Sequence, residues 1–293
     1  MKTPDAILGE AKSCSVRKEG GKRTKVVGQN AIKGRPLISV ITVAFNGAAT
    51  LEHTVCSVIE QTYKNIEYII IDGGSTDGTL DIIRKYEGNI DYWVSEKDAG
   101  IYDAMNKGIV LASGGVVGFI NADDFYATSD VLAKIAALFD DSNIDACYGD
   151  LCYVKQDDTS AVMRYWQSSD FRSCAFERGW CPPHPTFFVR REIYECCGMF
   201  DLSYSIAADV ELMMRFLEVR QVCAKYLPEV LVKMRMGGTT NRSLTNIVKQ
   251  NGEILRALRQ HGLQSSIVRL IGNKLFSRGL QFFVRPKQDI RMK

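Results

Sequence analysis

The feature that most constrains the fold is a regular alternation of short apolar runs and longer amphipathic segments between residues 37 and 120. The runs are rich in β-branched residues and have the length of buried strands. They read LISVITVAF at 37–45, IEYIIID at 66–72, IDYWVS at 90–95 and VVGFI at 116–120. Helical periodicity between them predicts helices near 50–63, 77–86 and 102–111. This alternation predicts βαβ units, and therefore an α/β fold with a mostly parallel central sheet flanked by helices.

The second half of the chain continues the pattern more loosely. It predicts a helix at 129–139, strands within IDACYGDLCYV, a strand near YLPEVLVKMR and a helix at 243–262. We expect three parts: a basic, mobile lead segment at 1–35, one domain at 36–240, and a helical basic tail at 241–293.

Composition places the chain among ordinary globular proteins, with 46% apolar and 24% charged residues. No run approaches the roughly 20 consecutive apolar residues of a membrane-spanning helix, and the N-terminal segment is polar. We therefore expect a cytoplasmic protein without an anchor or a secretory signal. The nine cysteines form no CxxC pair and no zinc-site spacing, which favours reduced thiols over disulfides.

The net charge of +3 conceals an asymmetry along the chain. Residues 1–35 and residues 264–293 each carry a net +6, which leaves −9 on the body between them. A nucleic-acid site would be lined by basic residues, so we expect no nucleic-acid partner. Basic ends suit contact with an anionic surface.

Two adjacent carboxylates, Asp123 and Asp124, end the apolar run in VVGFINADDFY. Charges at the edge of a core are unfavourable unless a cation or a hydrogen-bond partner offsets them. Carboxylate and amide oxygens are the ligands that Mg²⁺ or Mn²⁺ prefers. A turn or helix cap is the alternative interpretation of the pair.

Two further motifs combine acidic residues with glycine after a predicted strand. In IIIDGGSTDGT (69–79), Asp72 either accepts hydrogen bonds from a base or ribose or simply shapes a turn. In SEKDAGIYDAMNKGI (95–109), Asp98, Asp103, Asn106 and Lys107 surround a helix start, where polar ligands or ordinary caps are expected.

Taken together, the order VITVAFN, IIIDGGSTDGT, SEKDAGIYDAMNKG and FINADD resembles the family 2 glycosyltransferases, which are inverting nucleotide-sugar enzymes with the GT-A (Rossmann-like) fold. The resemblance covers roughly residues 36–235 and is closest to the branch that builds bacterial lipopolysaccharide and exopolysaccharide. It implies that the acidic pair holds a divalent metal, with Asp124 the direct ligand and Asp123 nearer the ribose and phosphate. The nucleoside would then lie against a set of five positions. These are Ala44, Phe45, Asn46, Asp72 and Asp98.

The chain departs from the family pattern at three positions. Relatives often have aspartate where this chain has Asn121 and Gly73, which leaves the base contacts open. The family places its catalytic base at a helix start, which matches Asp209 in AADVELMMR, although Ala208 stands where many relatives have glutamate. A simple acid at a helix N-terminus is the alternative for Asp209.

Other residues near these motifs have simpler interpretations. Glu211 and Arg215 are expected to be an i, i+4 pair on the helix surface. His184, in the loop WCPPHPTFF, resembles the acceptor-side loop of the branch and is a candidate acceptor or diphosphate contact; a structural histidine is the alternative. Trp166 and Trp180 could stack on sugars or pack in the core.

The expected function is metal-dependent transfer of a sugar from a nucleotide diphosphate, with a UDP-sugar favoured, to a saccharide or polyprenyl-linked saccharide acceptor. The basic amphipathic tail would suit peripheral membrane contact, or it packs on the domain. One rival is a sugar-phosphate nucleotidylyltransferase, but VAFNGAATLEHT has no lysine or arginine to grip a triphosphate. A non-catalytic GT-A scaffold is the other rival.

Overall fold

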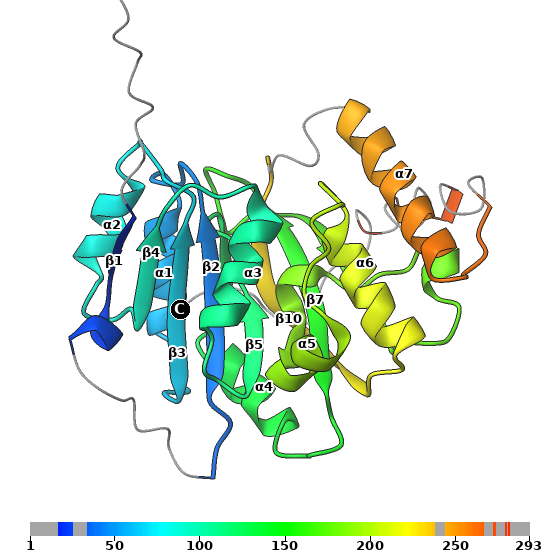
Figure 1. Ribbon diagram of the computed structural model, residues 1–293, viewed down its shortest axis with the longest axis horizontal. Helices are drawn as coiled ribbons and strands as arrows, with labels where there is room; N and C mark the ends of the chain where they lie inside the picture. The colour runs from blue at the N-terminus through cyan, green and yellow to red at the C-terminus, as the bar shows by residue number, and fades with distance from the viewer. Residues whose placement is uncertain are drawn as a thin grey trace, which may run out of the picture.

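A mixed ten-stranded sheet with helices on both faces organises the chain (Figure 1). The computed structural model describes residues 17–25, 34–237 and 244–266, and residues 272, 273, 279 and 281. Within these residues the strand order is β1-β4-β3-β2-β5-β9-β7-β10-β6, and β8 pairs with β7. The strands are β1 Lys18–Gly20, β2 Ile38–Ala44, β3 Ile66–Asp72, β4 Tyr92–Ser95, β5 Val116–Phe119, β6 Asp124–Tyr126, β7 Ala146–Val154, β8 Val162–Trp166, β9 Phe188–Arg190 and β10 Ala224–Arg235. The α-helices are α1 Leu51–Ile59, α2 Thr79–Lys85, α3 Ile101–Leu111, α4 Val131–Leu138, α5 Arg191–Cys197, α6 Ala208–Met214 and α7 Leu244–Gln260.

The predicted parallel arrangement is confirmed in the centre of the sheet. β4, β3, β2 and β5 are neighbours and pair in parallel. β9 is antiparallel to both β5 and β7, and β10 is parallel to β7, so β7 and β10 point in the same direction as β5. The sequence segment IDACYGDLCYV, in which strands were expected, forms the single strand β7.

Alternation of side chains along the central strands produces one core on each face. Ile41 and Val43 of β2 face the core that contains α3, α5 and α6. Val40 and Ala44 face the opposite core, which contains α1, α2 and α4. α7 joins the first core through Ile254 and its neighbours, so the C-terminal helix packs on the domain.

Gly108 allows α3 to approach β2 closely. A Cβ at this position would lie 2.5 Å from Cγ2 of Ile41, which is too short for any real contact. The glycine in DAMNKGI is therefore explained by packing. This packing fixes the depth of α3 on the sheet.

The prediction of a mobile lead segment at 1–35 is wrong for residues 17–25. Residues 18–20 form β1, which pairs antiparallel with β4 at the edge of the sheet. Arg23 forms an ion pair with the fully buried Glu67 and donates to the carbonyl of Leu111 at 2.8 Å. The charge of Glu67, buried in β3, is thus compensated by Arg23 of the lead segment. Local periodicity in the sequence cannot reveal this contact.

The predicted C-terminal helix is confirmed as α7, but most of the following basic segment lies outside the described residues. This applies to Arg269, Lys274 and Arg278 of the expected basic face. Asn273 donates from Nδ2 to the carbonyl of Arg178 at 3.1 Å. Across the residues that the structure describes, no helix is both long enough and apolar enough to span a bilayer.

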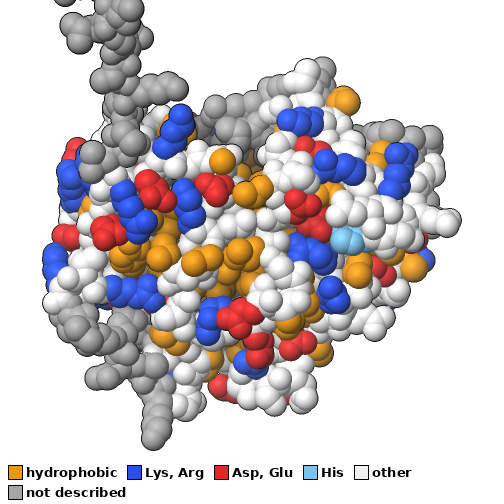
Figure 2. All heavy atoms as spheres, viewed as in Figure 1, with side chains coloured by type: hydrophobic (Ala, Val, Ile, Leu, Met, Phe, Trp, Pro, Cys, Tyr) orange, Lys and Arg blue, Asp and Glu red, His pale blue; other side chains and the backbone are white. Residues whose placement is uncertain are grey.

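Acidic and basic side chains are interspersed on the face that carries α3 and α5, with apolar side chains visible between them (Figure 2). The described surface on this side therefore shows mixed charge.

Candidate active site

The predicted site residues follow the carboxyl ends of parallel strands. β2, β3, β4 and β5 end at Ala44, Asp72, Ser95 and Phe119. Because β10 runs in the same direction, its end at Arg235 lies at the same edge of the sheet. Ligands of open α/β sheets bind outside this edge. The topology therefore brings the loops of all four sequence motifs to one edge.

The β2–α1 loop presents one aromatic side chain and is tied to the β3–α2 loop. Asn46 has a left-handed backbone with φ 49°, which asparagine tolerates. Its N–H donates to Oγ of Ser75 at 2.7 Å, and its Oδ1 accepts from the N–H of Thr76 at 2.9 Å. Ala44 is buried in the core, so its side chain cannot contact a ligand, whereas Phe45 is 66% exposed.

Asp72 is fully buried at the end of β3 and supports the loops around it. It accepts hydrogen bonds from the N–H of Ser75 at 3.1 Å and from Oγ of the same residue at 2.5 Å. Oγ of Ser95 donates to its Oδ2 at 2.6 Å. These bonds satisfy both carboxylate oxygens inside the protein, so Asp72 links the end of β3 to the end of β4.

Asp98 and Phe45 lie against the backbone of Gly73. A Cβ on Gly73 would lie 2.5 Å from Oδ2 of Asp98 and 3.3 Å from the ring of Phe45. The other carboxylate oxygen of Asp98 accepts from the N–H of Gly100 at 2.9 Å. Partial burial raises the pKa of Asp98. A half-buried carboxylate and an exposed ring thus flank a residue without a side chain.

The other polar residues of the third motif have structural roles. Lys107 pairs with Asp103 at 3.4 Å and with Glu96 at 3.1 Å. Asn106 pairs with both backbone groups of Phe200: Nδ2 donates to its carbonyl at 2.9 Å, and Oδ1 accepts from its N–H at 3.0 Å. These contacts are ion pairs and a tertiary contact, and Gly100 precedes the helix without a side-chain cap.

The acidic pair contains a buried carboxylate oxygen that has no hydrogen-bond partner. Asp124 is fully buried; its Oδ2 accepts from Nδ2 of Asn121 at 3.2 Å, whereas Oδ1 has no partner. Burial, followed by the charge of Asp123, raises the pKa of Asp124 well above its usual range. Asp123 is partly exposed. Two adjacent carboxylates with an unsatisfied oxygen fit a hard divalent cation.

Two side chains hold the backbone of the acidic loop. Oγ1 of Thr54 in α1 lies 3.0 Å from the carbonyl oxygen of Ala122 and 2.6 Å from that of Asp124. Nη1 of Arg235 donates to the carbonyl of Asp123 at 2.7 Å. Three consecutive carbonyls are therefore held by residues from α1 and β10. In the described part of the chain, no cluster of three or more His, Cys, Asp or Glu side chains is placed to bind a metal.

Arg235 was missed from the sequence although it supports the acidic loop. Its guanidinium lies over the ring of Phe125 at 4.9 Å, and His53 stacks on the same ring at 4.2 Å. Arg235 is 7% exposed, and burial lowers its pKa. The basic residue at the end of an apolar strand was the only local signal, because its partner Asp123 is 112 residues away.

Asp209 lies in the first turn of α6 and contacts one aromatic residue. The hydroxyl of Tyr102 in α3 donates to its Oδ1 at 3.0 Å. His184 is buried between Phe119 and Phe200, with ring centroids at 5.6 and 5.5 Å, and its Nε2 has no hydrogen-bond partner. Burial lowers the pKa of His184, and the charge of Asp209 partly offsets this effect. The two groups are therefore coupled electrostatically.

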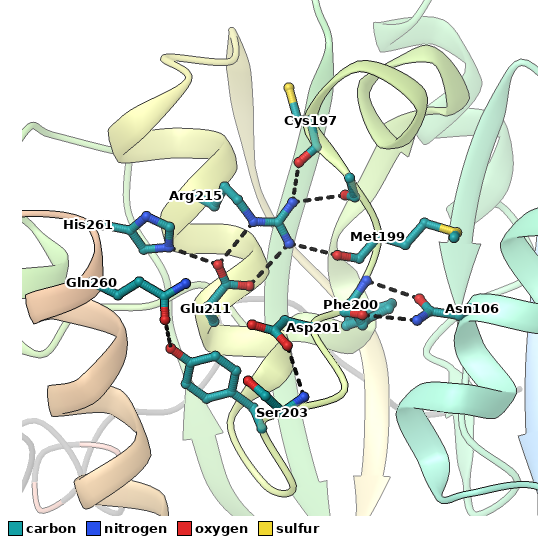
Figure 3. A network of polar contacts seen from close by, with 12 residues as sticks. Asn106, Cys197, Met199, Phe200, Asp201, Ser203, Glu211, Arg215, Gln260 and His261 are labelled. Carbon is teal, nitrogen blue, oxygen red and sulfur yellow. Dashed lines mark hydrogen bonds and ion pairs between the residues drawn. The ribbon is translucent and has the colours of Figure 1, made fainter.

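The predicted surface pair of Glu211 and Arg215 is wrong, because both belong to a buried network (Figure 3). Glu211 is 2% exposed and accepts from Nε and Nη2 of Arg215 at 3.0 and 3.1 Å and from Nε2 of His261 at 2.8 Å. Arg215 also donates to the carbonyls of residues 197–199. Ala208 is fully buried, so a carboxylate at that position would enter the core.

The tryptophans pack against other apolar residues, and the described cysteines are not paired in disulfides. Trp180 packs edge-on against Tyr148 and Phe176 at 5.9 and 5.6 Å. Trp166 packs against the core that contains α1. The described cysteines are free thiols, and Cys14 lies outside the described residues.

Comparison with known proteins supports a single family. A model described as Glycosyl transferase family 2 matches residues 39–198. A PGL/p-HBAD biosynthesis glycosyltransferase of Mycobacterium tuberculosis is 32% identical over 211 residues, which are 70% of this chain and 80% of the relative. An uncharacterized glycosyltransferase of the same species is 36% identical over 183 residues, 61% of this chain and 68% of the relative.

Solved structures of two proteins share the fold. The mannosyltransferase PcManGT from Pyrobaculum calidifontis, in complex with GDP-Man and Mn²⁺, has a TM-score of 0.59 and 19% identity, covering 83% of this chain and 70% of that one. S. aureus TarS 1-349 in complex with UDP-GlcNAc has a TM-score of 0.60 and 16% identity, covering 82% and 72%. These likenesses confirm the expected GT-A fold.

Proposed function

This chain belongs to glycosyl transferase family 2, and we propose that it is a metal-dependent inverting enzyme that transfers a sugar from a nucleotide-diphosphate donor. The observation that carries the proposal is the acidic pair after β5, where Asp124 keeps a buried carboxylate oxygen without a partner. Family membership favours sugar transfer over the nucleotidylyltransferase considered from the sequence. An intact set of acidic residues argues against a non-catalytic scaffold.

The metal site would consist of Asp123 and Asp124, and the ion would be Mg²⁺ or Mn²⁺. Asp123 is partly exposed, whereas Asp124 is fully buried. We therefore assign both as ligands: Asp124 would bind the ion through its unpartnered Oδ1, as the resemblance implies, and Asp123 would bind it from the exposed side. Mg²⁺-type ions commonly bind one or two carboxylates and complete their coordination with water and substrate phosphates. When bound, the ion would stabilise the negative charge that develops on the departing diphosphate.

The donor side of the site is formed by the loops after β2, β3, β4 and β5. Phe45 and Asp98 flank Gly73 there, and we assign them as the nucleoside contacts, with Asp72 and Asn46 holding the loops in place. The exposed ring can stack on a base, and the carboxylate can accept hydrogen bonds from a base or ribose. A UDP-sugar remains the expected donor, although solved neighbours of this fold contain either UDP-GlcNAc or GDP-Man.

The acceptor side is formed by Tyr102, His184 and the segment that leads into α6 at Asp209. Asp209 would remove the proton from the acceptor hydroxyl as the oxygen attacks the anomeric carbon. The bond to the diphosphate breaks on the opposite face, so an α-linked donor gives a β-linked product. Neutral His184, with its free Nε2, would contact the acceptor or the diphosphate.

The relatives indicate only the general chemical class of the acceptor. We propose a saccharide or a lipid-linked saccharide in cell-surface polysaccharide synthesis, since a relative is named for PGL/p-HBAD biosynthesis. The protein would work in the cytoplasm, and its basic C-terminal segment would contact the inner face of the membrane.

Thermal unfolding with nucleotide diphosphates tests the donor and the metal together. UDP, GDP, dTDP and ADP are each added with Mn²⁺ or with EDTA, because a ligand that binds only the folded state raises the melting temperature. We expect one nucleotide to stabilise the protein only with Mn²⁺. Absence of stabilisation by every nucleotide would contradict the transferase proposal, and equal stabilisation in EDTA would contradict the metal.

Matched variants assign the effect to the acidic pair. Asp123→Asn keeps the shape of the side chain and should abolish the metal-dependent shift. Asp81→Asn is the control, because Asp81 is an 81% exposed carboxylate on α2. A metal-dependent shift that survives in Asp123→Asn would contradict the assignment of Asp123 as a ligand.

A further inference from the structure

Tyr102 is in direct contact with the proposed base. It lies in the first turn of α3, is 8% exposed, and donates its hydroxyl proton to Oδ1 of Asp209 at 3.0 Å. Building on the proposed function, we propose that Tyr102 is a positioning residue that holds one oxygen of Asp209 and leaves the other to take the acceptor proton. This gives Tyr102, which lines the proposed acceptor side, a defined role toward the base.

The ring of Tyr102 is itself held in place by its own helix. It stacks on Phe200 at 5.5 Å with an interplanar angle of 24°. Asn106, four residues further along α3 and thus on the same face, binds both backbone groups of Phe200 (Figure 3). One face of α3 therefore fixes both the tyrosine and the ring on which it rests.

The segment between α5 and α6 is fixed near both ends, so the distance between Tyr102 and Asp209 is set by packing. Arg215 donates to the carbonyls of residues 197–199 at the beginning of the segment (Figure 3). Glu253 of α7 accepts from the N–H groups of residues 205–207 just before α6, at 2.9–3.2 Å. α3 and α6 consequently meet across a rigid segment.

The charges around Asp209 favour a protonated Tyr102 hydroxyl that donates a hydrogen bond to the carboxylate. Burial raises the pKa of Tyr102 well above its usual range, so the hydroxyl keeps its proton at any working pH. The charge of Asp209 acts on His184, which lies in the short 3-10 helix before β9, but burial lowers the pKa of this histidine. Glu253 contributes a further negative charge from α7. A phenol hydrogen bond stabilises the ionised carboxylate, which is the form that accepts a proton.

Replacing Tyr102 by Phe removes this hydrogen bond and keeps the ring. The probe is release of UDP from UDP-GlcNAc, or of GDP from GDP-Man, with Mn²⁺ and water as the acceptor. A hydrogen bond to a charged group corresponds to roughly a ten- to hundredfold effect. We expect kcat of Tyr102→Phe to fall at least about tenfold with little change in KM for the donor.

Tyr204→Phe is the matched control, because its hydroxyl donates to Oε1 of Gln260 at 2.9 Å, away from the base. It should keep both the kcat and the donor KM of the wild type.

Two outcomes would overturn the inference. These are a Tyr102→Phe kcat within twofold of the wild type, or a loss of kcat/KM that comes from a raised donor KM with kcat unchanged. An equal loss in Tyr204→Phe would also contradict it, since the effect would then be general to the helix packing. Failure of the proposed function is distinguishable, because Asp209→Asn would then retain donor hydrolysis.

Discussion

The donor side and the acceptor side of the proposed site are held together over different distances along the chain. On the donor side Asp72 binds Ser75 three residues away, and Asn46 reaches Ser75 across 29 residues. On the acceptor side Tyr102 reaches Asp209 across 107 residues, and Asn106 reaches Phe200 across 94. The loops after β2 and β3 are therefore held by turns and by contacts between neighbouring strands, whereas the acidic loop and the acceptor side depend on partners that lie 68 to 112 residues away.

The largest expected effect comes from the acidic loop, where a substitution should remove activity and leave the fold intact. Asp123→Asn in saturating Mn²⁺ should reduce donor hydrolysis roughly 10³-fold, since metal stabilisation of the leaving group contributes several kcal/mol. Its melting temperature without ligand should stay close to that of the wild type and of Asp81→Asn. A stable variant with unchanged turnover would show that the donor side does not depend on this carboxylate.

The comparison also explains what could be predicted from the sequence. The four central strands and their following loops were predicted because a period of two residues and short turn motifs are local signals. The acidic pair and Asp98 were found in the same way. Arg23, Thr54 and Arg235 were missed because their partners lie 44 to 112 residues away.

The error at Glu211 and Arg215 has the same origin. An i, i+4 spacing predicts a surface pair only if the helix face is exposed, and this face is covered by α7 and by residues 197–199. The sequence contains the spacing but not the burial. The signal that could have indicated burial was the apolar content of ELMMRFLE on all sides of these two residues.

Acceptor-side stability should depend strongly on this buried network. Glu211→Gln leaves Arg215 with an uncompensated charge and should lower the free energy of unfolding by about 3 kcal/mol in urea denaturation. Glu195→Gln on α5 is the control, because it breaks an i, i+4 pair with Arg191 that is 58% exposed on the glutamate side. The control should change stability by less than about 0.5 kcal/mol. Equal losses of stability in Glu211→Gln and Glu195→Gln would contradict the burial of Glu211.

The same network gives a pH dependence. Burial opposes ionisation of Glu211, but hydrogen bonds from His261 and Arg215 outweigh it, so the folded-state pKa is lowered. A lowered carboxyl pKa stabilises the fold above the unfolded value of about 4.3 and loses this contribution as the pH falls through the folded value. The stability difference between the wild type and Glu211→Gln should therefore be constant above about pH 5.5 and shrink toward zero in strong acid. A difference that grows in acid would contradict the network.

Replacing Thr54 should give the smallest and most specific effect, because its hydroxyl joins the acidic loop to α1. Thr54→Val removes only the hydroxyl and should reduce stability by about 1 kcal/mol. It should also raise the Mn²⁺ concentration needed for nucleotide stabilisation by roughly tenfold, since the loop that carries Asp123 is loosened. Thr42→Val, which loses a buried contact to the hydroxyl of Tyr68, should affect stability alone. A shared change in Mn²⁺ dependence would exclude a specific role for Thr54.

The most direct test of the central claim separates donor binding from turnover at Asp209. Nucleotide binding with Mn²⁺ is measured by titration calorimetry on the wild type and Asp209→Asn, alongside hydrolysis of the donor. The account predicts equal binding affinity and turnover reduced about 10²- to 10⁴-fold, the range for a lost general base. Turnover near that of the wild type would contradict Asp209 as the base and the division of the site into a donor and an acceptor side.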